Sequence, residues 1–309
     1  MMRIGIDLGG TNIAAGLIDD GMEIVAQDTV RTPPGADAIV NEMEVLAHSL
    51  CSQAGLRLSD IECAGIGSPG AIDPREGMVV YSNNLNFRNV PLAVMLSHRL
   101  DMTVHIGNDA NVAALGEFHA GAGRHISSMI MVTLGTGVGG GIVLGGRIYD
   151  GFNGMGGEVG HMAVVKDGEP CSCGRNGCWE AYASATGLIR MTRSAISRNP
   201  DSLLKSIAID KGKVSGRTAF LAARRGDAAG NEVVEKYLSY VACGAANLIN
   251  LFQPEMLCFG GGISNEGQYL IDRMLPMLEP ELYDVGDRRT RVCLAELGND
   301  AGIIGAAMM

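Results

Sequence analysis

Residues 3–18 read R-I-G-I-D-L-G-G-T-N-I-A-A-G-L-I, and residues 128–144 read S-M-I-M-V-T-L-G-T-G-V-G-G-G-I-V-L. In each stretch an apolar run ends in a glycine turn and a second apolar run follows, which predicts two β-hairpins. When Asp7–Gly9 is set on Thr133–Gly135, the apolar and glycine positions agree at an offset of 126 residues. We therefore expect two related halves, with a cleft between their glycine turns as the natural ligand site.

The composition is that of a large α/β protein. A chain of 309 residues exceeds one comfortable hydrophobic core, and with 47% hydrophobic but only 5% aromatic residues its interior must be mainly aliphatic. The net charge of -10, without a block of like charges, argues against nucleic acid or an anionic membrane as partner. Residues 1–7 show neither an apolar signal region nor a cleavage site, so we expect a cytoplasmic protein.

Hydrophobic periodicity outlines the elements outside the hairpins. Helices are predicted over residues 38–54, 108–120, 180–197, 233–252 and 300–309, with Asn108 as an N-cap. Strands are predicted at 63–67 and 255–259, and the second of them ends in Gly260, Gly261 and Gly262.

Glycine turns can aim several backbone N–H groups at phosphate oxygens because no side chain stands in the way. Gly9–Thr11, Gly135–Gly137 and Gly260–Gly262 all qualify, although each alone is more typical of an ordinary hairpin turn. Gly135, Gly137 and Gly140 also satisfy G-x-G-x-x-G, but a strand follows instead of the helix that a nicotinamide site requires. The sequence contains no P-loop motif either.

Two aspartates lie at positions where a carboxylate has either a structural role, as a cap, or a role in catalysis. Asp7 ends a buried strand, where it either faces a cation such as Mg²⁺ or bonds its own turn. Asp109 begins a helix, where it either satisfies exposed N–H groups or accepts a hydroxyl proton during phosphoryl transfer.

The strongest local signal is a cysteine cluster. Cys171, Cys173 and Cys178 are separated by one and four residues in a glycine-rich loop, and His161 lies ten residues upstream of the first. This Cys₃His set predicts tetrahedral Zn²⁺, and four protein ligands leave no open position, so the metal is expected to be structural. Glu158 and Glu180 flank the loop and are either ligands for a polyhydroxylated molecule, support for the metal, or solvated surface groups.

Six stretches, in this order, resemble the ROK family of sugar kinases and repressors, with the greatest similarity to its bacterial glucokinase branch. They are Asp7–Thr11, Gly107–Glu117, Leu134–Gly141, Glu158–His161, Cys171–Glu180 and Gly260–Gly262. The resemblance implies an actin-like ATPase (hexokinase-type) fold: two α/β domains around a cleft, with a zinc-binding loop. It predicts a small domain of residues 1–120 plus 299–309, where the last helix packs, and a large domain of residues 121–298.

The resemblance also implies residue roles. Asp109 matches the catalytic base that takes the proton of the sugar 6-hydroxyl. Positions that match sugar ligands are Asn108, Asp109, Glu158, His161 and Glu180, and less firmly Gly70 and Asn84. Asp7 matches the Mg²⁺-side carboxylate. Positions that match ATP-binding loops are Gly9, Gly10, Thr11, Asn12, Gly135, Thr136, Gly137, Gly260, Gly261 and Gly262.

These matches imply an ATP-dependent kinase for the 6-hydroxyl of a hexose, most similar to glucokinases, that uses Mg²⁺, holds structural Zn²⁺ and forms a homo-oligomer, either a dimer or a tetramer. One departure is Phe87, where glucokinases often have tryptophan. The alternatives are a kinase for another hexose or N-acetylmannosamine, and a sugar-responsive repressor or other regulatory binding protein of the same family.

Overall fold

The computed structural model describes residues 1–283 and 289–309, which form two compact units. The first unit contains residues 1–129, 141–157 and 296–309. The second contains residues 130–140 and 158–295. The chain therefore passes between the units more than once, and it ends in the unit where it began.

The first unit is built on a five-stranded sheet with the order β3-β2-β1-β4-β8. Its strands are β1 (Met2–Leu8), β2 (Asn12–Ile18), β3 (Ile24–Arg31), β4 (Ile61–Ser68) and β8 (Val104–Asn108). Strands β1 and β2 pair antiparallel, which confirms the first predicted hairpin, while β4 runs parallel to β1 and β8 runs parallel to β4. The carboxyl ends of β1, β4 and β8 therefore share one edge of the sheet.

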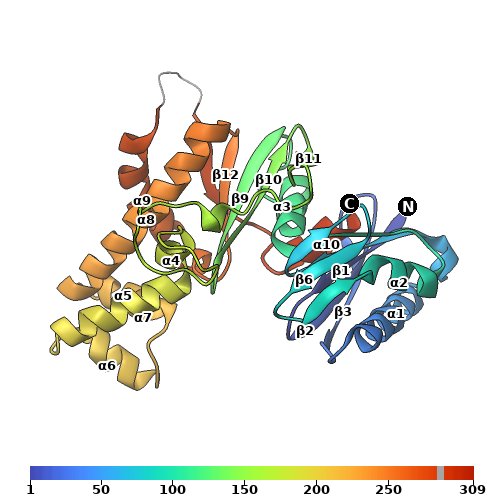
Figure 1. The fold of residues 1–309 in the computed structure, drawn as a ribbon, viewed down its shortest axis with the longest axis horizontal. Coiled ribbons are helices and arrows are strands. Elements are labelled where there is room, and N and C mark those ends of the chain that lie inside the picture. The colour runs from blue at the N-terminus through green and yellow to red at the C-terminus, as the bar shows by residue number, and fades with distance from the viewer. Residues whose placement is uncertain (284–288) are drawn as a thin grey trace. The chain divides into compact units, whose positions relative to one another are not determined.

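Four helices cover this sheet, two on each face (Figure 1). They are α1 (Ala36–Gln53) and α2 (Leu92–Leu100) on one side, and α3 (Asp109–Ala120) and α10 (Asp300–Ala307) on the other. A short 3-10 helix, η1 (Leu58–Asp60), precedes β4. Buried side chains of α1, among them Ile39, Met43 and Leu50, join Ile4 and Ile6 of β1 in one core.

A small antiparallel sheet extends the first unit between β4 and α2. Its strands β5 (Ala71–Asp73), β6 (Met78–Ser82) and β7 (Phe87–Val90) lie in that order. The side chains of Ile72, Val79 and Phe87 are buried in the same core as the larger sheet. This sheet carries the turn at Gly70 and the loop that contains Asn84.

The C-terminal helix α10 lies unusually close to its neighbours. A Cβ atom built on Gly5 of β1 or on Gly65 of β4 would lie 1.8 Å from the carbonyl oxygen of Ile303 or Ala306, respectively. A Cβ on Gly305 would lie 1.8 Å from the carbonyl oxygen of Val112 in α3. Backbone therefore meets backbone at these points, and only glycine leaves the space. The last helix therefore packs on β1, β4 and α3.

A second five-stranded sheet has the order β11-β10-β9-β12-β13. Its strands are β9 (Ser128–Leu134), β10 (Val138–Leu144), β11 (Arg147–Ile148), β12 (Met256–Gly260) and β13 (Arg291–Leu294). The neighbouring strands β9 and β10 confirm the second predicted hairpin, and the division between the units falls within them. Across the described residues, no helix has the length and apolar character needed to span a bilayer.

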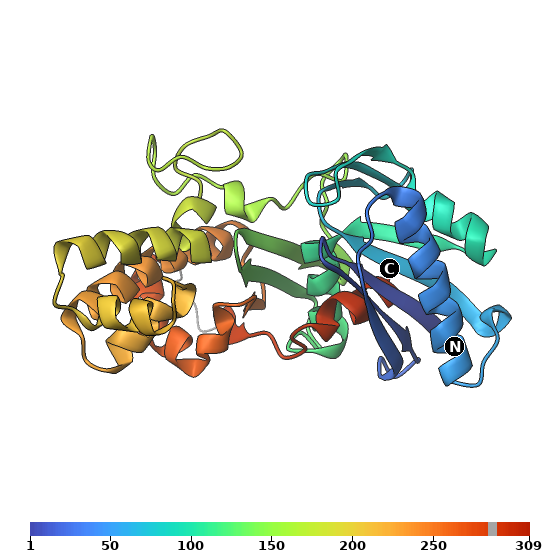
Figure 2. The same ribbon diagram turned by 90° about the horizontal axis from the view of Figure 1, so that it is seen from below.

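The second unit is largely helical, and Figure 2 shows the loop before α4 projecting from these helices. The helices are α4 (Glu180–Ala183), α5 (Ala185–Arg198), α6 (Leu203–Asp210), α7 (Gly216–Arg224), α8 (Ala228–Phe252) and α9 (Gln268–Leu278), with short 3-10 helices η2 (Val159–His161), η3 (Ser264–Glu266) and η4 (Glu279–Glu281).

The single helix predicted over residues 180–197 is wrong in one respect. Ser184 is extended, ends α4 and caps α5, because its hydroxyl accepts a hydrogen bond from the backbone N–H of Gly187. The apolar pattern continues across this break, so periodicity alone does not detect it. Helix α8 also begins at Ala228 instead of Val233, since the Asp227 side chain caps it through the N–H of Gly230.

The close approach of α10 gives a direct test. Gly65→Ala should lower the free energy of unfolding by about 3 kcal/mol, because the backbone carbonyl of Ala306 cannot move aside like a side chain. Thermal unfolding should show a midpoint lower by roughly 6–12 °C. Gly262→Ala is the matched control, since nothing lies within 4 Å of its added methyl group. Equal midpoints for the two variants would show that the first unit does not depend on this contact.

Candidate functional site

Two aspartates lie at the shared carboxyl edge of β1, β4 and β8. Asp7 is near the end of β1, where its backbone pairs with Gly67 of β4, and Gly67 in turn pairs with Gly107, two residues before Asp109. Desolvation by burial, and secondarily the charge of Asp109, raise the pKa of Asp7 to about 6. This edge therefore concentrates negative charge where protein excludes much of the water, a setting that favours a cation.

The start of α3 holds Asp109 in a fixed position. Asn108 caps the helix, its Oδ1 accepting from the backbone N–H groups of Ala110 and Asn111 at 3.0 and 3.3 Å. This confirms the predicted N-cap. The Asp109 side chain is open to solvent, yet the surrounding protein desolvates it and raises its pKa, opposed by hydrogen bonds from the N–H groups of Ala110 and Asp109 and from Asn108. A carboxylate so placed is rigid, accessible and more basic than usual.

Other predicted residues of the first unit lie around this edge. The Asn108 amide donates to the carbonyl of Gly70 at 3.1 Å, and Gly70 has a φ of +116°, which favours glycine. The glycine turn after β1 contacts the residue that follows β3, since the N–H of Thr32 donates to the Thr11 carbonyl at 2.9 Å.

A cavity of about 740 Å³ opens beside the same turn. Gly10 and Asn84 line it, and a Cβ on Gly10 would lie 3.3 Å from that of Asn84. The remaining lining comes from the segments 32–36 and 85–88, together with Ile39 and Val90. Within the first unit, a predicted phosphate-turn residue and a predicted sugar ligand therefore share one hollow.

The second glycine turn, Gly135–Gly137, is tied to α4 and α5. Glu180 accepts a hydrogen bond from the N–H of Val138 at 3.1 Å, and a Cβ on Gly137 would lie 2.3 Å from the same carboxylate. The hydroxyl of Thr186 donates to the carbonyl of Thr136 at 2.8 Å. A side chain at position 137 would displace the Glu180 carboxylate from its place beside the turn.

The third glycine cluster meets the second within the same unit. Gly261 has a φ of +83°, and its Cβ would lie 2.7 Å from the carbonyl oxygen of Leu134, the residue before the turn. The N–H of Ile263 donates to that carbonyl at 3.0 Å. Nothing lies within 4 Å of a Cβ on Gly262, so the backbone there is open. Two of the three predicted phosphate turns therefore converge.

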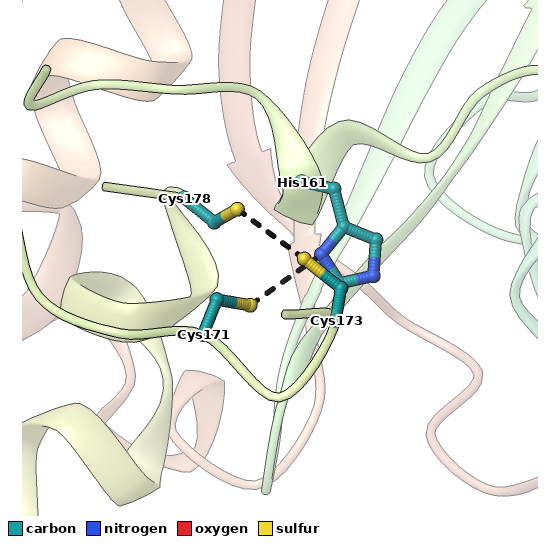
Figure 3. Close-up of side chains that lie close together, drawn as sticks. All are labelled: His161, Cys171, Cys173 and Cys178. Carbon is teal, nitrogen blue, oxygen red and sulfur yellow. Dashed lines mark hydrogen bonds between the residues drawn. The ribbon is translucent and has the colours of Figure 1, made fainter. Parts of the chain in front are cut away.

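Four side chains in the projecting loop face one another, as Figure 3 shows. They are His161, Cys171, Cys173 and Cys178, whose ligand atoms all lie within 4.8 Å of one another. Cys171 Sγ is 3.7 Å from His161 Nδ1, and Cys173 Sγ is 3.7 Å from Cys178 Sγ. The geometry brings the predicted Cys₃His set together.

These spacings suit a tetrahedral ion. Zinc–sulfur bonds of about 2.3 Å in a tetrahedron separate two sulfur ligands by roughly 3.8 Å, close to the distances in this loop. Three soft thiolates with one imidazole are typical of zinc, and four protein ligands leave no position for water. The donor set therefore fits a closed structural zinc site.

Sequence reasoning missed two residues that complete these sites. The Ser172 hydroxyl donates to Glu180 Oε1 at 3.0 Å and so connects the cysteine loop to the second glycine turn. Glu117, which is fully buried in α3, accepts backbone hydrogen bonds from segments distant in sequence. Neither position has a recognisable spacing, because each partner is a backbone group or lies on another element.

Comparison with known proteins gives one family. A family model described as the ROK family matches residues 3–309. A glucokinase of Halalkalibacterium halodurans is 37% identical, with 99% of this chain and 94% of that protein aligned. Among solved structures, a ROK family glucokinase from Streptomyces griseus in complex with glucose and AMPPNP has a TM-score of 0.81 at 34% identity, covering 100% of this chain and 98% of that one. A ROK hexokinase from Thermus thermophilus has a TM-score of 0.85 at 32% identity, covering 100% and 97%.

The raised pKa of Asp7 predicts a pH-dependent cost. The native state binds this proton up to a pH of about 6, whereas the unfolded chain releases it near the ordinary value of 3.8, so stability falls as the pH rises between these values. Asp7→Asn should therefore be more stable than wild type at pH 8, by at most about 3 kcal/mol, and lose this advantage near pH 4. Denaturant unfolding across this range measures the effect.

Asp272→Asn, which changes an exposed aspartate of α9, serves as the control. An Asp7→Asn variant whose stability difference from wild type is the same at pH 8 and pH 4 would contradict the raised pKa.

Proposed function

Because the chain belongs to the ROK family over residues 3–309, we propose that it is an ATP-dependent sugar kinase that phosphorylates the 6-hydroxyl of glucose. The observation that carries the proposal is the capped helix start that presents Asp109, within a chain similar over nearly its whole length to named glucokinases. Its substrates are then glucose and ATP.

Asp109 is proposed as the general base. A base must be within reach of the hydroxyl proton and have a pKa above that of an ordinary exposed aspartate to take it efficiently. Asn108 and the first turn of α3 hold Asp109 rigidly, and desolvation raises its pKa. As the sugar oxygen attacks the γ-phosphorus of ATP, Asp109 receives the 6-hydroxyl proton and ADP departs.

The proposed sugar ligands are the residues that match sugar-binding positions of the family. They are Gly70, Asn84, Asn108, Asp109, Glu158, His161 and Glu180. Carboxylates and amides bond pairs of neighbouring hydroxyls well, because each offers two polar atoms at a fixed spacing.

The glycine turns are proposed to bind ATP. Gly9–Asn12, Gly135–Gly137 and Gly260–Gly262 would offer backbone N–H groups to phosphate oxygens without steric hindrance. Asp7 is the proposed carboxylate on the Mg²⁺ side, and a bound Mg²⁺ would neutralise phosphate charge during transfer. The raised pKa of Asp7 supports this role, since a carboxylate that is costly to ionise alone gains most from a cation.

His161 is proposed to serve the metal and the sugar together. Its Nδ1 faces Cys171, so zinc would bind that nitrogen, and the ring would carry its remaining proton on Nε2 (Figure 3). Nε2 would then act only as a donor to a sugar oxygen. A zinc ion held by these four residues would stabilise the loop and would supply no reactive position.

A coupled assay of ADP release tests the proposal with ATP, Mg²⁺ and a panel of glucose, mannose, fructose, allose, N-acetylmannosamine and N-acetylglucosamine. Selective turnover of glucose is expected. Turnover of another sugar would correct the substrate and keep the mechanism. Sugar binding without any turnover would favour a regulatory binding protein of the family instead.

Removal of the base should separate binding from chemistry. Asp109→Asn keeps the shape of the side chain but cannot accept the proton, so kcat should fall by at least about 10²-fold. The dissociation constant of glucose, measured by calorimetry, should change by only a few fold. A variant that turns over at the wild-type rate would rule out Asp109 as the base.

Loss of one thiolate should release the metal. Cys173→Ser should lower the zinc content, measured by plasma mass spectrometry, from about one ion per chain to well below that, and weaken glucose binding because His161 loses its anchor. Cys63→Ser, which changes a half-buried cysteine of β4, is the matched control and should keep its zinc. Full zinc content in Cys173→Ser would mean that this thiol is not a ligand.

A further inference from the structure

Glu117 is a fully buried carboxylate on α3, two turns after Asp109. Its oxygens accept three backbone hydrogen bonds. Oε2 accepts from the N–H groups of Ala122 and Glu296, each at 3.1 Å, and Oε1 accepts from the N–H of Leu297 at 2.7 Å. Glutamate is rarely buried completely unless its charge is compensated, and here backbone donors provide the compensation.

The three donors lie in the segments next to two of the four places where the chain changes unit, the first and the last. Ala122 belongs to the segment that follows α3 and leads into β9, where the chain leaves the first unit after Met129. Glu296 is the first residue after the final return to the first unit. One carboxylate therefore holds an outgoing and a returning crossover, segments that lie 174 residues apart in the sequence.

The surroundings of Glu117 are built for this charge. A Cβ on Gly121 would lie 2.0 Å from Glu117 Oε2, so glycine leaves room for the carboxylate. The charge lies in the C-terminal half of α3, where the helix dipole opposes a carboxylate. A residue needed only to fill space would be apolar here, which indicates that the hydrogen bonds themselves are the reason for glutamate.

We propose that Glu117 is a positioning residue for phosphoryl transfer, which fixes these two of the four connecting segments to the helix that presents Asp109. Each crossover then moves together with α3 as one rigid body. Motion between the units has to be absorbed elsewhere along the connecting chain, so the orientation of Asp109 is preserved. This inference rests on the proposed kinase function.

The proposed role of Glu117 is to keep the Asp109 carboxylate accurately placed for the reaction. Asp109 must reach the sugar hydroxyl that attacks the γ-phosphate, and misplacement by about 1 Å can cost 10²-fold in rate. Loss of the Glu117 hydrogen bonds should also admit water to the γ-phosphate, because exclusion of water depends on accurate placement of the surrounding groups. Loss of the Glu117 hydrogen bonds should therefore increase ATP hydrolysis by water as well as slow phosphoryl transfer to the sugar.

The test variant is Glu117→Gln in the full-length protein with zinc bound. The amide oxygen can keep the bonds from Ala122 and Glu296, but the amide NH₂ then faces the N–H of Leu297, and that hydrogen bond is lost. We expect kcat for glucose to fall about 10–100-fold, the KM for ATP to stay within twofold, and the ratio of ADP released to sugar phosphate formed to rise clearly above one.

Glu296→Gln is the matched control. Its exposed side chain pairs with Arg124, and only its backbone N–H bonds Glu117, so kcat and the product ratio should equal those of wild type. If Glu117→Gln retains the wild-type rate, or loses rate only in proportion to its unfolded fraction with a product ratio of one, the positioning role is overturned. A wild-type protein that phosphorylates no sugar would instead overturn the proposed function.

Hydrogen exchange on the wild type keeps the inference testable even if the variant does not fold. The amides of Ala122, Glu296 and Leu297 should stay protected to the same degree with and without glucose and an unreactive ATP analogue. Faster exchange of these amides on ligand binding would show that the anchor opens during the cycle, and would overturn the proposal.

Discussion

The first unit depends on a contact that only glycine permits, the direct approach of the α10 backbone to β1, β4 and α3. The carbonyl oxygens of Ile303 and Ala306 occupy the positions that side chains at Gly5 and Gly65 would need. This contact brings the C-terminal helix onto the strands that end at the acidic edge. Gly302 shows the consequence, since a Cβ there would lie 3.0 Å from the Asp7 carboxylate. The same packing that completes the core therefore crowds, and desolvates, a candidate functional carboxylate.

The close packing at this edge makes ionisation of Asp7 unfavourable. Asp7 and Asp109 repel each other, and burial adds to the cost of ionising Asp7, so both effects raise its pKa. A domain selected for stability alone would place a neutral residue there. The free energy of ionising Asp7 is offset only when a cation or a proton binds there. This edge of the sheet is therefore suited to hold a cation and to take part in the proton transfer of a kinase. At Asp7 the folding stability of the protein and the needs of the reaction therefore favour different residues.

Much of this arrangement could be predicted from the sequence, because it rests on local patterns. The two hairpins follow from apolar runs around glycine turns, the Asn108 cap from its place before a helix, and the Cys₃His cluster from ligand spacing. The break at Ser184 could not be predicted, since a side chain can replace a helical hydrogen bond without changing the hydrophobic pattern. The role of Glu117, which ends one of the family-matching stretches, could not be predicted either, because its partners are backbone groups up to 180 residues away.

Three consecutive residues explain how a projecting loop can still position a carboxylate. Cys178 joins the metal cluster, Trp179 is fully buried against Gly244 of α8 and donates to the Tyr240 carbonyl at 2.7 Å, and Glu180 accepts the N–H of Val138. A metal bound to the cysteine cluster would fix the loop on one side of Trp179, and the hydrogen bond to the glycine turn fixes it on the other. Because Ser172 also donates to Glu180, a change in the cysteine loop reaches the carboxylate through one hydrogen bond. A metal bound to this cluster would therefore orient the candidate sugar ligands without an open coordination position.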